Sequence, residues 1–276
     1  MSARARVALS GLPGRMAAAA AKAIAAAEDL ELLPFGLTGP GMGGVARVGA
    51  VEVRLYEPGQ REDFLAAARA GGPFIAVDYT LPGAVAENAR FYAAYRVPFV
   101  MGTTGGDREE LIAIASRAQL PAVIAPNMAL PIVALTAMLE HGAGAYPGML
   151  SGFRLKVRES HQRGKADTSG TARALIELFR RMGASFDESD LAMCRDPEEQ
   201  RREWDIPKEH LGGHAYHTYE LSGYEGALTL SFAHNVLGRA AYAAGTVHAV
   251  RFLTARRLER PETPYTMMDV LRHLKG

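Results

Sequence analysis

The sequence predicts an α/β protein of two domains: a doubly wound parallel-sheet domain, then an α+β domain with a mixed or antiparallel sheet. Three observations predict it. Up to residue 126, short apolar runs alternate with helical patterns, as in a parallel sheet with crossover helices. Between residues 153 and 233, apolar and polar residues alternate, which indicates strands with one face in water. The length of 276 residues suits one large or two modest domains.

The first domain is expected over residues 1–126. Its predicted strands, in order, span residues 6–10, 30–37, 51–56, 73–78, 98–101 and 121–125. Its predicted helices span residues 17–27, 61–70, 84–95 and 107–119. In the last helix Asp107 can cap the first turn, and Glu109 and Glu110 follow where carboxylates interact favourably with the helix dipole.

The second domain is expected over residues 127–236, and a C-terminal helical segment over 237–276 is expected to return to the first domain. Alternating strands are predicted over residues 153–159, 215–221 and 227–233, the last two joined by a turn at 222–226. Helices are predicted over residues 129–140, 172–182, 239–258 and 266–274. The charged stretch 195–210 predicts a solvated loop or a short helix.

Composition excludes several classes of protein. With 31 basic and 30 acidic residues, the chain has no electrostatic footprint for nucleic acid or for an anionic membrane. Its longest small-apolar run, residues 16–27, is interrupted by Lys22 and is shorter than the roughly 20 residues of a membrane span. A single cysteine, Cys194, allows no internal disulfide. Because a strand-like run begins close to Met1, no leader is expected, and we expect a cytoplasmic protein.

A glycine-containing turn follows the first predicted strand and opens the first helix. It consists of Gly11, Leu12, Pro13, Gly14, Arg15 and Met16. Gly11 permits a tight turn, and Gly14 permits pyrophosphate to approach the amides at the start of the helix. An ordinary strand–helix turn explains the degenerate spacing equally well. The next predicted strand ends in Thr38 and Gly39 without a carboxylate, so nothing opposes the 2′-phosphate of NADP, for which Arg15 is the nearest candidate cation.

Polar clusters follow three further predicted strands. They are Asp78-Tyr79-Thr80, then Gly102-Thr103-Thr104-Gly105, then Ala125-Pro126-Asn127. Ligands of doubly wound sheets bind at the carboxyl ends of strands, where these clusters converge. A capped turn is the alternative explanation of the two threonines.

The densest polar cluster spans residues 159–171, between a predicted strand and a predicted helix. Thr168 or Ser169 can cap this helix, and the amides of Ser169, Gly170 and Thr171 then form an anion site. Lys165 adds a positive charge, so the cluster suits a carboxylate. His161 is a titratable donor at the end of the strand.

The run His161-Gln-Arg-Gly-Lys165-x-Asp-x-Ser-Gly-Thr171 resembles the signature of the 4-hydroxy-tetrahydrodipicolinate (dihydrodipicolinate) reductase family. The resemblance extends in order over nearly the whole chain and is strongest to the plant and cyanobacterial branch. The other matching motifs are Gly11-x-x-Gly14-Arg-Met, Gly102-Thr-Thr-Gly105, Ala125-Pro-Asn-Met128 and His234-x-x-x-x-Arg239. Gln162 and Gly164 stand where the bacterial branch commonly has histidines, and Ala17 replaces a third glycine.

This resemblance implies a Rossmann-like coenzyme domain and the reduction of a cyclic imine dicarboxylate by NADPH or NADH in lysine and diaminopimelate biosynthesis. It places the proton donor on His161 and the catalytic lysine on Lys165. The implied coenzyme contacts are Gly11, Leu12, Pro13, Gly14, Arg15, Met16, Thr80, Gly102, Thr103, Thr104 and Asn127. The implied substrate contacts are Gln162, Lys165, Ser169, Gly170, Thr171 and Arg239. A small-molecule dicarboxylate is the expected partner, and a homodimer or homotetramer is expected.

The chemistry requires a hydride acceptor on the ring and a proton supplied by His161 or Lys165. We hypothesise that Lys165 depresses the pKa of His161 and that the bound dicarboxylate restores it. A metal site at His210, His214 and His217 is conceivable, but the odd spacing puts His214 and His217 on opposite faces of a strand, so no metal is expected.

Three alternatives stay open. A reductase of a different cyclic imine would use the same residues. A thiol-dependent dehydrogenase would need Cys194 beside the nicotinamide, yet Cys194 is far in sequence from every strand-end cluster. A non-catalytic nucleotide-binding homologue would not need the pair formed by His161 and Lys165.

Overall fold

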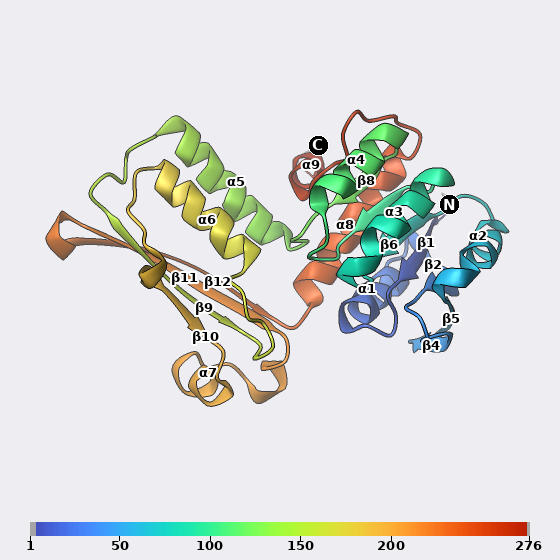
Figure 1. Cartoon of the computed structure of the whole chain (residues 1–276), viewed down its shortest axis with the longest axis horizontal. Coiled ribbons are helices and arrows are strands. Elements are labelled where there is room, and N and C mark those ends of the chain that lie inside the picture. Colours follow the sequence, from blue (N-terminus) through green and yellow to red (C-terminus); the bar gives the residue numbers. More distant parts are fainter. Residues whose placement is uncertain (1–3, 275–276) are drawn as a thin grey trace. The chain divides into compact units, whose positions relative to one another are not determined.

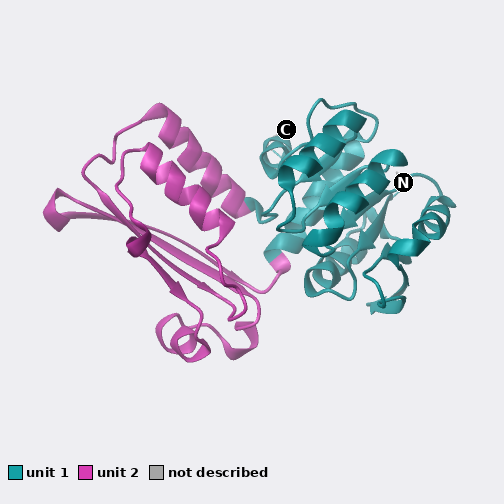
Figure 2. Cartoon of the chain, in the orientation of Figure 1, with its two compact units in different colours: residues 1–130, 241–276 teal, residues 131–240 magenta. Residues whose placement is uncertain are grey.

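The computed structural model describes residues 4–274, which form two compact units (Figure 2). Unit 1 comprises residues 4–130 and 241–274, and unit 2 comprises residues 131–240. Both boundaries lie four residues beyond those expected, at 126 and 236, because the chain changes unit where helices α5 (Leu130–Ala145) and α8 (Ala240–Arg256) begin. The chain therefore leaves unit 1, builds unit 2 and returns.

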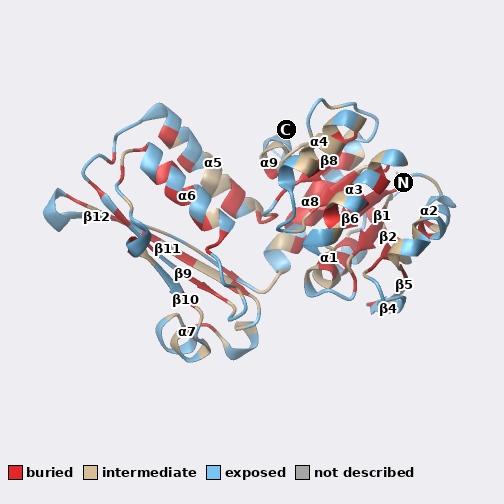
Figure 3. Cartoon of the chain, viewed as in Figure 1, coloured by how far each residue is buried: buried red, intermediate tan, exposed pale blue. Residues whose placement is uncertain are grey.

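Unit 1 is built on a five-stranded sheet of order β2-β1-β6-β7-β8, in which all neighbours are parallel (Figure 1). Its strands are β1 (Ala5–Ser10), β2 (Leu30–Leu32), β6 (Ile75–Asp78), β7 (Phe99–Met101) and β8 (Ala122–Ile124). Its helices are α1 (Arg15–Ala26), α2 (Arg61–Arg69), α3 (Val85–Ala94), α4 (Arg108–Ala118), α8 and α9 (Met267–His273). The strands are almost wholly buried (Figure 3), as expected of apolar runs covered on both faces. The doubly wound prediction is confirmed.

The prediction of one strand over residues 30–37 is wrong. The chain leaves the large sheet after β2, and β3 (Phe35–Leu37) pairs instead with β5 (Val51–Tyr56) in a separate three-stranded sheet. Pro34 explains the break, because proline has no N–H for the ladder of the large sheet. Its carbonyl accepts a hydrogen bond from the Arg54 amide at 2.9 Å. The third strand, β4 (Gly44–Val48), was not predicted, since it is mostly exposed and shows no apolar alternation.

Unit 2 is a four-stranded mixed sheet of order β10-β9-β11-β12, as predicted. Its strands are β9 (Arg154–His161), β10 (Leu191–Cys194), β11 (His214–Gly223) and β12 (Leu228–Leu237). Helices α5 and α6 (Gly170–Arg181) cover one face of this sheet (Figure 1), where Leu155, Val157, Tyr219 and Leu221 are buried in one cluster with Leu175 and Phe179 of α6. β10 was not predicted.

The charged stretch 195–210 contains a short helix, α7 (Pro197–Glu203). Asp196 caps it by accepting hydrogen bonds from the amides of Glu198 and Glu199, both at 3.0 Å, and Pro197 occupies the first helical position. The open choice between loop and short helix is thus settled for these residues. Within residues 4–274, no helix has both the length and the apolar character needed to cross a membrane.

Gly245 of α8 allows the closest backbone approach in unit 1. A Cβ at this position would lie 1.6 Å from the carbonyl oxygen of Met128. We expect Gly245→Ala to lower the stability of the protein by at least about 1–3 kcal/mol, because the helix would have to move away from the segment that follows β8. The measurement is the midpoint of urea unfolding followed by circular dichroism.

Gly144 in α5 provides the matched control, since a Cβ there meets no atom within 4 Å. Gly144→Ala should leave the midpoint unchanged or raise it slightly, as alanine is the better helix former. Equal midpoints for the two variants would contradict the close approach.

Candidate active site

The carboxyl ends of the unit 1 strands form a backbone cradle with little room for side chains. Gly11 follows β1 with φ +105°, and a Cβ there would lie 2.4 Å from the carbonyl oxygen of Tyr79. A Cβ at Gly14 would lie 2.7 Å from the carbonyl oxygen of Gly11. α1 begins directly afterwards at Arg15, so the amides of its first turn are presented at a surface that only backbone lines. This geometry fits a dinucleotide pyrophosphate.

A buried carboxylate, Asp78, fixes the polar residues beside this cradle. It is fully buried at the end of β6 and accepts hydrogen bonds from the Thr80 hydroxyl at 2.6 Å, the Asn88 amide at 3.0 Å and the Tyr92 hydroxyl at 2.9 Å. The Thr103 hydroxyl in turn donates to the Thr80 carbonyl at 3.0 Å. Asp78 therefore positions Thr80 directly and Thr103 through Thr80, two of the three threonines that were singled out as coenzyme contacts.

The structure brings the predicted coenzyme residues together at one edge of the sheet. The glycine turn follows β1, Thr80 follows β6, residues 102–104 follow β7, and Asn127 follows β8. The Gly102 amide donates to the Asp78 carbonyl at 3.0 Å, and the Asn127 side chain accepts from the Ala129 amide at 2.9 Å. These are the ends where ligands of doubly wound sheets bind.

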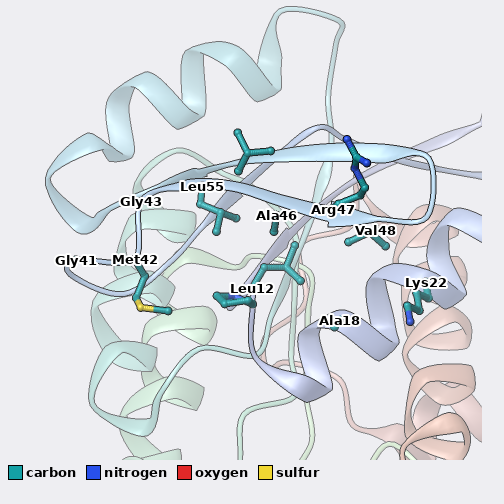
Figure 4. A pocket seen from close by; sticks show the side chains of 12 residues that line it. Leu12, Ala18, Lys22, Gly41, Met42, Gly43, Ala46, Arg47, Val48 and Leu55 are labelled. Atoms are coloured by element: carbon teal, nitrogen blue, oxygen red, sulfur yellow. The ribbon is translucent and has the colours of Figure 1, made fainter.

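A cavity of about 480 Å³ lies beside the glycine turn (Figure 4). Leu12 and Pro13 of the turn line it, together with Gly41–Gly43 and the strands β4 and β5. Two cations, Lys22 and Arg47, also line it, and no carboxylate does. Arg15, the cation expected from the sequence, is exposed and does not line this cavity. Lys22 and Arg47 are thus residues that could hold an anionic group of a dinucleotide.

In unit 2, His161 and Glu159 lie on the inward face of β9, and His217 of β11 lies opposite Glu159 in the strand register. All three are buried, and Glu159 is completely buried. Nε2 of His217 is 3.1 Å from Nε2 of His161 and 3.6 Å from Oε2 of Glu159. His234 of β12 packs on His217 with ring centroids 4.5 Å apart. The inward face thus carries apolar side chains at one end and a polar cluster at the other.

Arg195, which follows β10, neutralises the buried carboxylate and holds the loop after His161. Its guanidinium forms an ion pair with Oε1 of Glu159 and donates to the carbonyl of Lys165 at 2.7 Å and to that of Asp167 at 3.3 Å. Oε2 of Glu159 accepts a hydrogen bond from the Ser169 amide at 3.1 Å. One ion pair therefore connects β9, β10, the loop 162–168 and the start of α6.

The pKa values of this cluster follow from burial and charge. Burial alone would raise the pKa of Glu159, but the neighbouring His217 ring and the hydrogen bonds from Arg195 and the Ser169 amide hold it below its usual range. Burial lowers the pKa of His161, and the neighbouring His217, Arg195 and Lys165 lower it further, against the opposite effect of Glu159. The hypothesis that Lys165 depresses the pKa of His161 has the right direction, but burial is the largest cause and Lys165 is the smallest.

The substrate residues predicted from sequence lie around this cluster. Ser169 is the N-cap of α6, and Gly170 begins the helix with Thr171 next, but the Ser169 amide is already bound to Glu159. The amine of Lys165 pairs with Asp167 at 2.9 Å. The carbonyl of Gln162 accepts from the Lys165 amide at 3.0 Å, closing the turn between them.

Arg239 follows β12, and its guanidinium packs against Gly213, just before β11. The strand registers place Gly213 at the end of the sheet where β9 ends at His161. A Cβ at Gly213 would lie 2.8 Å from Nη1 of Arg239.

Cys194 and His214 lie on the other face of this sheet. Cys194 pairs in register with Ser160, whose hydroxyl is 2.9 Å from Nε2 of His214, and Ser160 points away from the cluster on the Glu159 side. His214 and His217 therefore face opposite sides of β11, as their spacing predicted. Burial raises the pKa of the Cys194 thiol, which keeps it protonated. A buried neutral thiol disfavours a thiol-dependent dehydrogenase.

Glu159, His161 and His217 are close enough to hold a metal ion, since their ligand atoms lie within 4.8 Å of one another. Two observations weigh against a cation there. Arg195 already neutralises Glu159. Nδ1 of His217 is buried without a hydrogen-bond partner among residues 4–274, whereas a metal-binding histidine needs an acceptor at its other nitrogen. The geometry favours a hydrogen-bonded cluster.

The sequence analysis left Glu159, His217 and Arg195 out of the site. A signal existed for two of them, because Glu159 is in phase with Leu155 and Val157 on a buried strand face, and His217 is in phase with Tyr219 and Leu221. A charged or titratable side chain in phase with a core face needs a partner. No local pattern identifies Arg195, which is 36 residues from Glu159.

The two units together define a class of protein. A doubly wound unit with a dinucleotide cradle, joined to a mixed-sheet unit with a buried acid–base cluster, is the architecture of a nicotinamide-nucleotide-dependent oxidoreductase. Family models for the N-terminus and the C-terminus of dihydrodipicolinate reductase match residues 5–128 and 132–271. The chain belongs to the dihydrodipicolinate reductase family.

Curated relatives and solved structures agree with this assignment. The chain is 41% identical to the chloroplastic 4-hydroxy-tetrahydrodipicolinate reductase 1 of Arabidopsis thaliana over 96% of this chain and 77% of the relative. It is 40% identical to the probable chloroplastic reductase 2 of Oryza sativa over 96% of this chain and 82% of the relative. A dipicolinate-bound dihydrodipicolinate reductase from Paenisporosarcina has a similar fold, with TM-score 0.65 and 19% identity over 95% and 97% of the two chains.

We expect Glu159→Gln to destabilise unit 2 by about 3–5 kcal/mol, because the substitution leaves the Arg195 guanidinium buried without its counter-charge. Urea unfolding at neutral pH measures the loss. Glu203→Gln is the control, since its pair with Arg202 is exposed and should contribute at most about 1 kcal/mol. A Glu159→Gln variant as stable as the control would show that the buried pair does not hold the loop.

Proposed function

We propose that this protein reduces the cyclic imine dicarboxylate 4-hydroxy-tetrahydrodipicolinate with a nicotinamide coenzyme, in the biosynthesis of diaminopimelate and lysine. Membership of the family supports this reaction. The observation that carries the proposal is the buried cluster at the end of β9. It holds His161 four residues before Lys165 and directly beside the loop that leads to α6. A titratable ring next to cationic groups suits a doubly acidic substrate.

We propose a separate role for each residue of the site. Loss of the 4-hydroxyl group of the substrate as water leaves a ring carbon conjugated with the imine. A bound coenzyme would supply a hydride to this carbon, and the electron pair would move toward the ring nitrogen. His161 supplies the proton that completes the reduction. Lys165 and the amides of Gly170 and Thr171 hold the carboxylates, and Gln162 and Arg239 are further proposed substrate contacts.

Neutral His161 cannot be the acid until it gains a proton. The bound dicarboxylate brings negative charge next to the ring, which favours the imidazolium form and raises the pKa of His161 above its lowered value in the free enzyme. Substrate binding and proton uptake are therefore coupled. The same argument explains why a buried, uncharged ring can serve as the proton donor.

For the coenzyme we propose a preference for NADPH over NADH. The cavity beside the glycine turn supports it, because Lys22 and Arg47 line this cavity. Arg47 pairs with Glu52 in an exposed ion pair, which a 2′-phosphate can replace. Arg15 at the start of α1 remains a proposed contact of the phosphate chain. NADH would bind the same cradle without using these two cations.

We also propose that the protein works as a homodimer or homotetramer in the cytoplasm. The edge strand β12 supports an oligomer, since within residues 4–274 it pairs only with β11 and leaves Leu228 and Leu237 each 40% exposed. A single cysteine, buried as a free thiol, is consistent with a reducing compartment.

NADPH oxidation with freshly generated imine substrate tests the reaction. We expect kcat/KM to fall about tenfold per pH unit above the lowered pKa of His161, since this ratio reports the free enzyme, in which high pH removes the catalytic proton. The kcat value should stay level to higher pH, because it reports the complex, in which the pKa of His161 is restored. Both profiles are measured from pH 5.5 to 9.

The variant His161→Ala should lose at least about 100-fold in kcat. His141→Ala serves as the matched control, since His141 is an exposed residue of α5. Full activity of His161→Ala, or a kcat/KM independent of pH, would remove His161 from the mechanism. Absence of imine reduction by the wild type would reject the proposed function itself.

Removing the cations of the cavity tests the coenzyme preference. Lys22→Ala and Arg47→Ala should each raise KM for NADPH about tenfold and leave KM for NADH nearly unchanged, because only NADPH carries the 2′-phosphate. Arg54→Ala is the control, since Arg54 lies over the Tyr56 ring and does not line the cavity. Equal increases for both coenzymes would place these cations elsewhere on the dinucleotide.

A further inference from the structure

One hydrogen atom lies between His217 and His161, and it can belong to either ring. Their Nε2 atoms are 3.1 Å apart, and Oε2 of Glu159 is 3.6 Å from Nε2 of His217. His217 is nearly fully buried, and its Nδ1 has no hydrogen-bond partner among residues 4–274. The nitrogen of His217 that carries the proton therefore decides whether Nε2 of His161 donates or accepts this hydrogen bond.

The hydrogen bond can have His161 or His217 as its donor, and these two arrangements differ in free energy. If His161 donates from Nε2, then neutral His217 must carry its own proton on Nδ1, which leaves a buried N–H without an acceptor. If His217 donates from Nε2, its Nδ1 is an unprotonated nitrogen, so His217 has no buried N–H without a partner. In this arrangement the N–H of His217 also lies beside the Glu159 carboxylate, which attracts a donor and repels a lone pair.

We infer that His217 is a positioning residue that donates to Nε2 of His161 and holds the neutral His161 ring with its proton on Nδ1. Nδ1 is the ring nitrogen that points away from His217, so it is the atom through which His161 donates to a bound substrate. The imidazolium form arises only when Nε2 gains a proton of its own in place of the hydrogen bond from His217. The inference rests on the proposed function for its catalytic meaning, but the tautomer itself is a property of the free protein.

Buried neighbours hold the rings of His217 and His161 in the positions that this hydrogen bond requires. His234 packs on one side of the His217 ring, with an interplanar angle of 32°. The backbone carbonyl of His161 accepts a hydrogen bond from the side chain of the fully buried Gln200 at 2.7 Å, which fixes the end of β9. Burial lowers the pKa of His234 to about 4, so this ring adds no charge at neutral pH. The donor and its acceptor are thus both held by buried neighbours.

Nitrogen NMR of histidine-labelled protein at pH 8, without ligands, reads the tautomer directly. The His161 signals are assigned by their loss in His161→Gln. We expect Nδ1 of His161 to be protonated and Nε2 to be unprotonated in the wild type. In His217→Leu, which removes the donor, the Nε2-protonated tautomer should become populated. In His217→Gln the side-chain amide can donate from a similar position and should restore the wild-type tautomer.

Kinetics provide the second measurement. His217→Leu should lower kcat at least about 100-fold and move the fall of kcat/KM to higher pH, because the donor that opposed protonation at Nε2 is gone. His217→Gln should recover most of kcat. His248→Leu controls for a histidine-to-leucine change, since His248 in α8 also has a buried Nδ1 without a partner among the described residues.

A wild-type protein with Nε2 of His161 protonated would overturn the inference, as would an unchanged tautomer in His217→Leu. Because circular dichroism and thermal unfolding are recorded for each variant, an unfolded His217→Leu is recognised, and the His217→Gln tautomer then decides. If the protein shows the expected tautomers but does not reduce the imine, the proposed function fails and the role of His217 in setting the tautomer stands.

Discussion

The buried ion pair between Glu159 and Arg195 is the interaction on which the unit 2 site depends. A carboxylate with no exposed surface requires a counter-charge and hydrogen bonds, and the Arg195 guanidinium and the Ser169 amide supply them. The same guanidinium binds the carbonyls of Lys165 and Asp167. The loop that carries Lys165 is therefore fixed by the pair that keeps β9 and β10 together.

In unit 1 a different buried acid, Asp78, also positions the polar residues beside a predicted binding site. Asp78 lies at the end of a central parallel strand and accepts only from neutral donors, among them the Thr80 hydroxyl and the Tyr92 hydroxyl. Its charge stays on the protein side of the cradle, while the glycine turn presents backbone amides to a ligand. In both units, a strand that would otherwise be apolar ends in a buried acid, and the neighbouring polar residues are positioned by it.

Much of this arrangement could be predicted from the sequence. The doubly wound unit, the mixed sheet and the convergence of strand ends followed from periodicity, because those signals are local. The split of residues 30–37 could have been foreseen from Pro34, which has no N–H for the ladder. The sequence pattern identifies Glu159 as a carboxylate in phase with a core face. The pattern does not identify Arg195, because this residue meets Glu159 only when β10 pairs with β9, and β10 is a short strand with two exposed residues.

The lowered pKa of His161 has a consequence for selectivity under the proposed mechanism. Since a shift of one pKa unit corresponds to 1.36 kcal/mol, part of the binding free energy of any anionic substrate is used to protonate His161. An imine with two carboxylates brings enough negative charge both to pair with Lys165 and to favour the imidazolium form. An imine with one carboxylate provides less of this stabilisation, so it binds more weakly and leaves the acid less often protonated. Under the proposed mechanism, the site would select dicarboxylates through the protonation of His161 as well as through direct contacts.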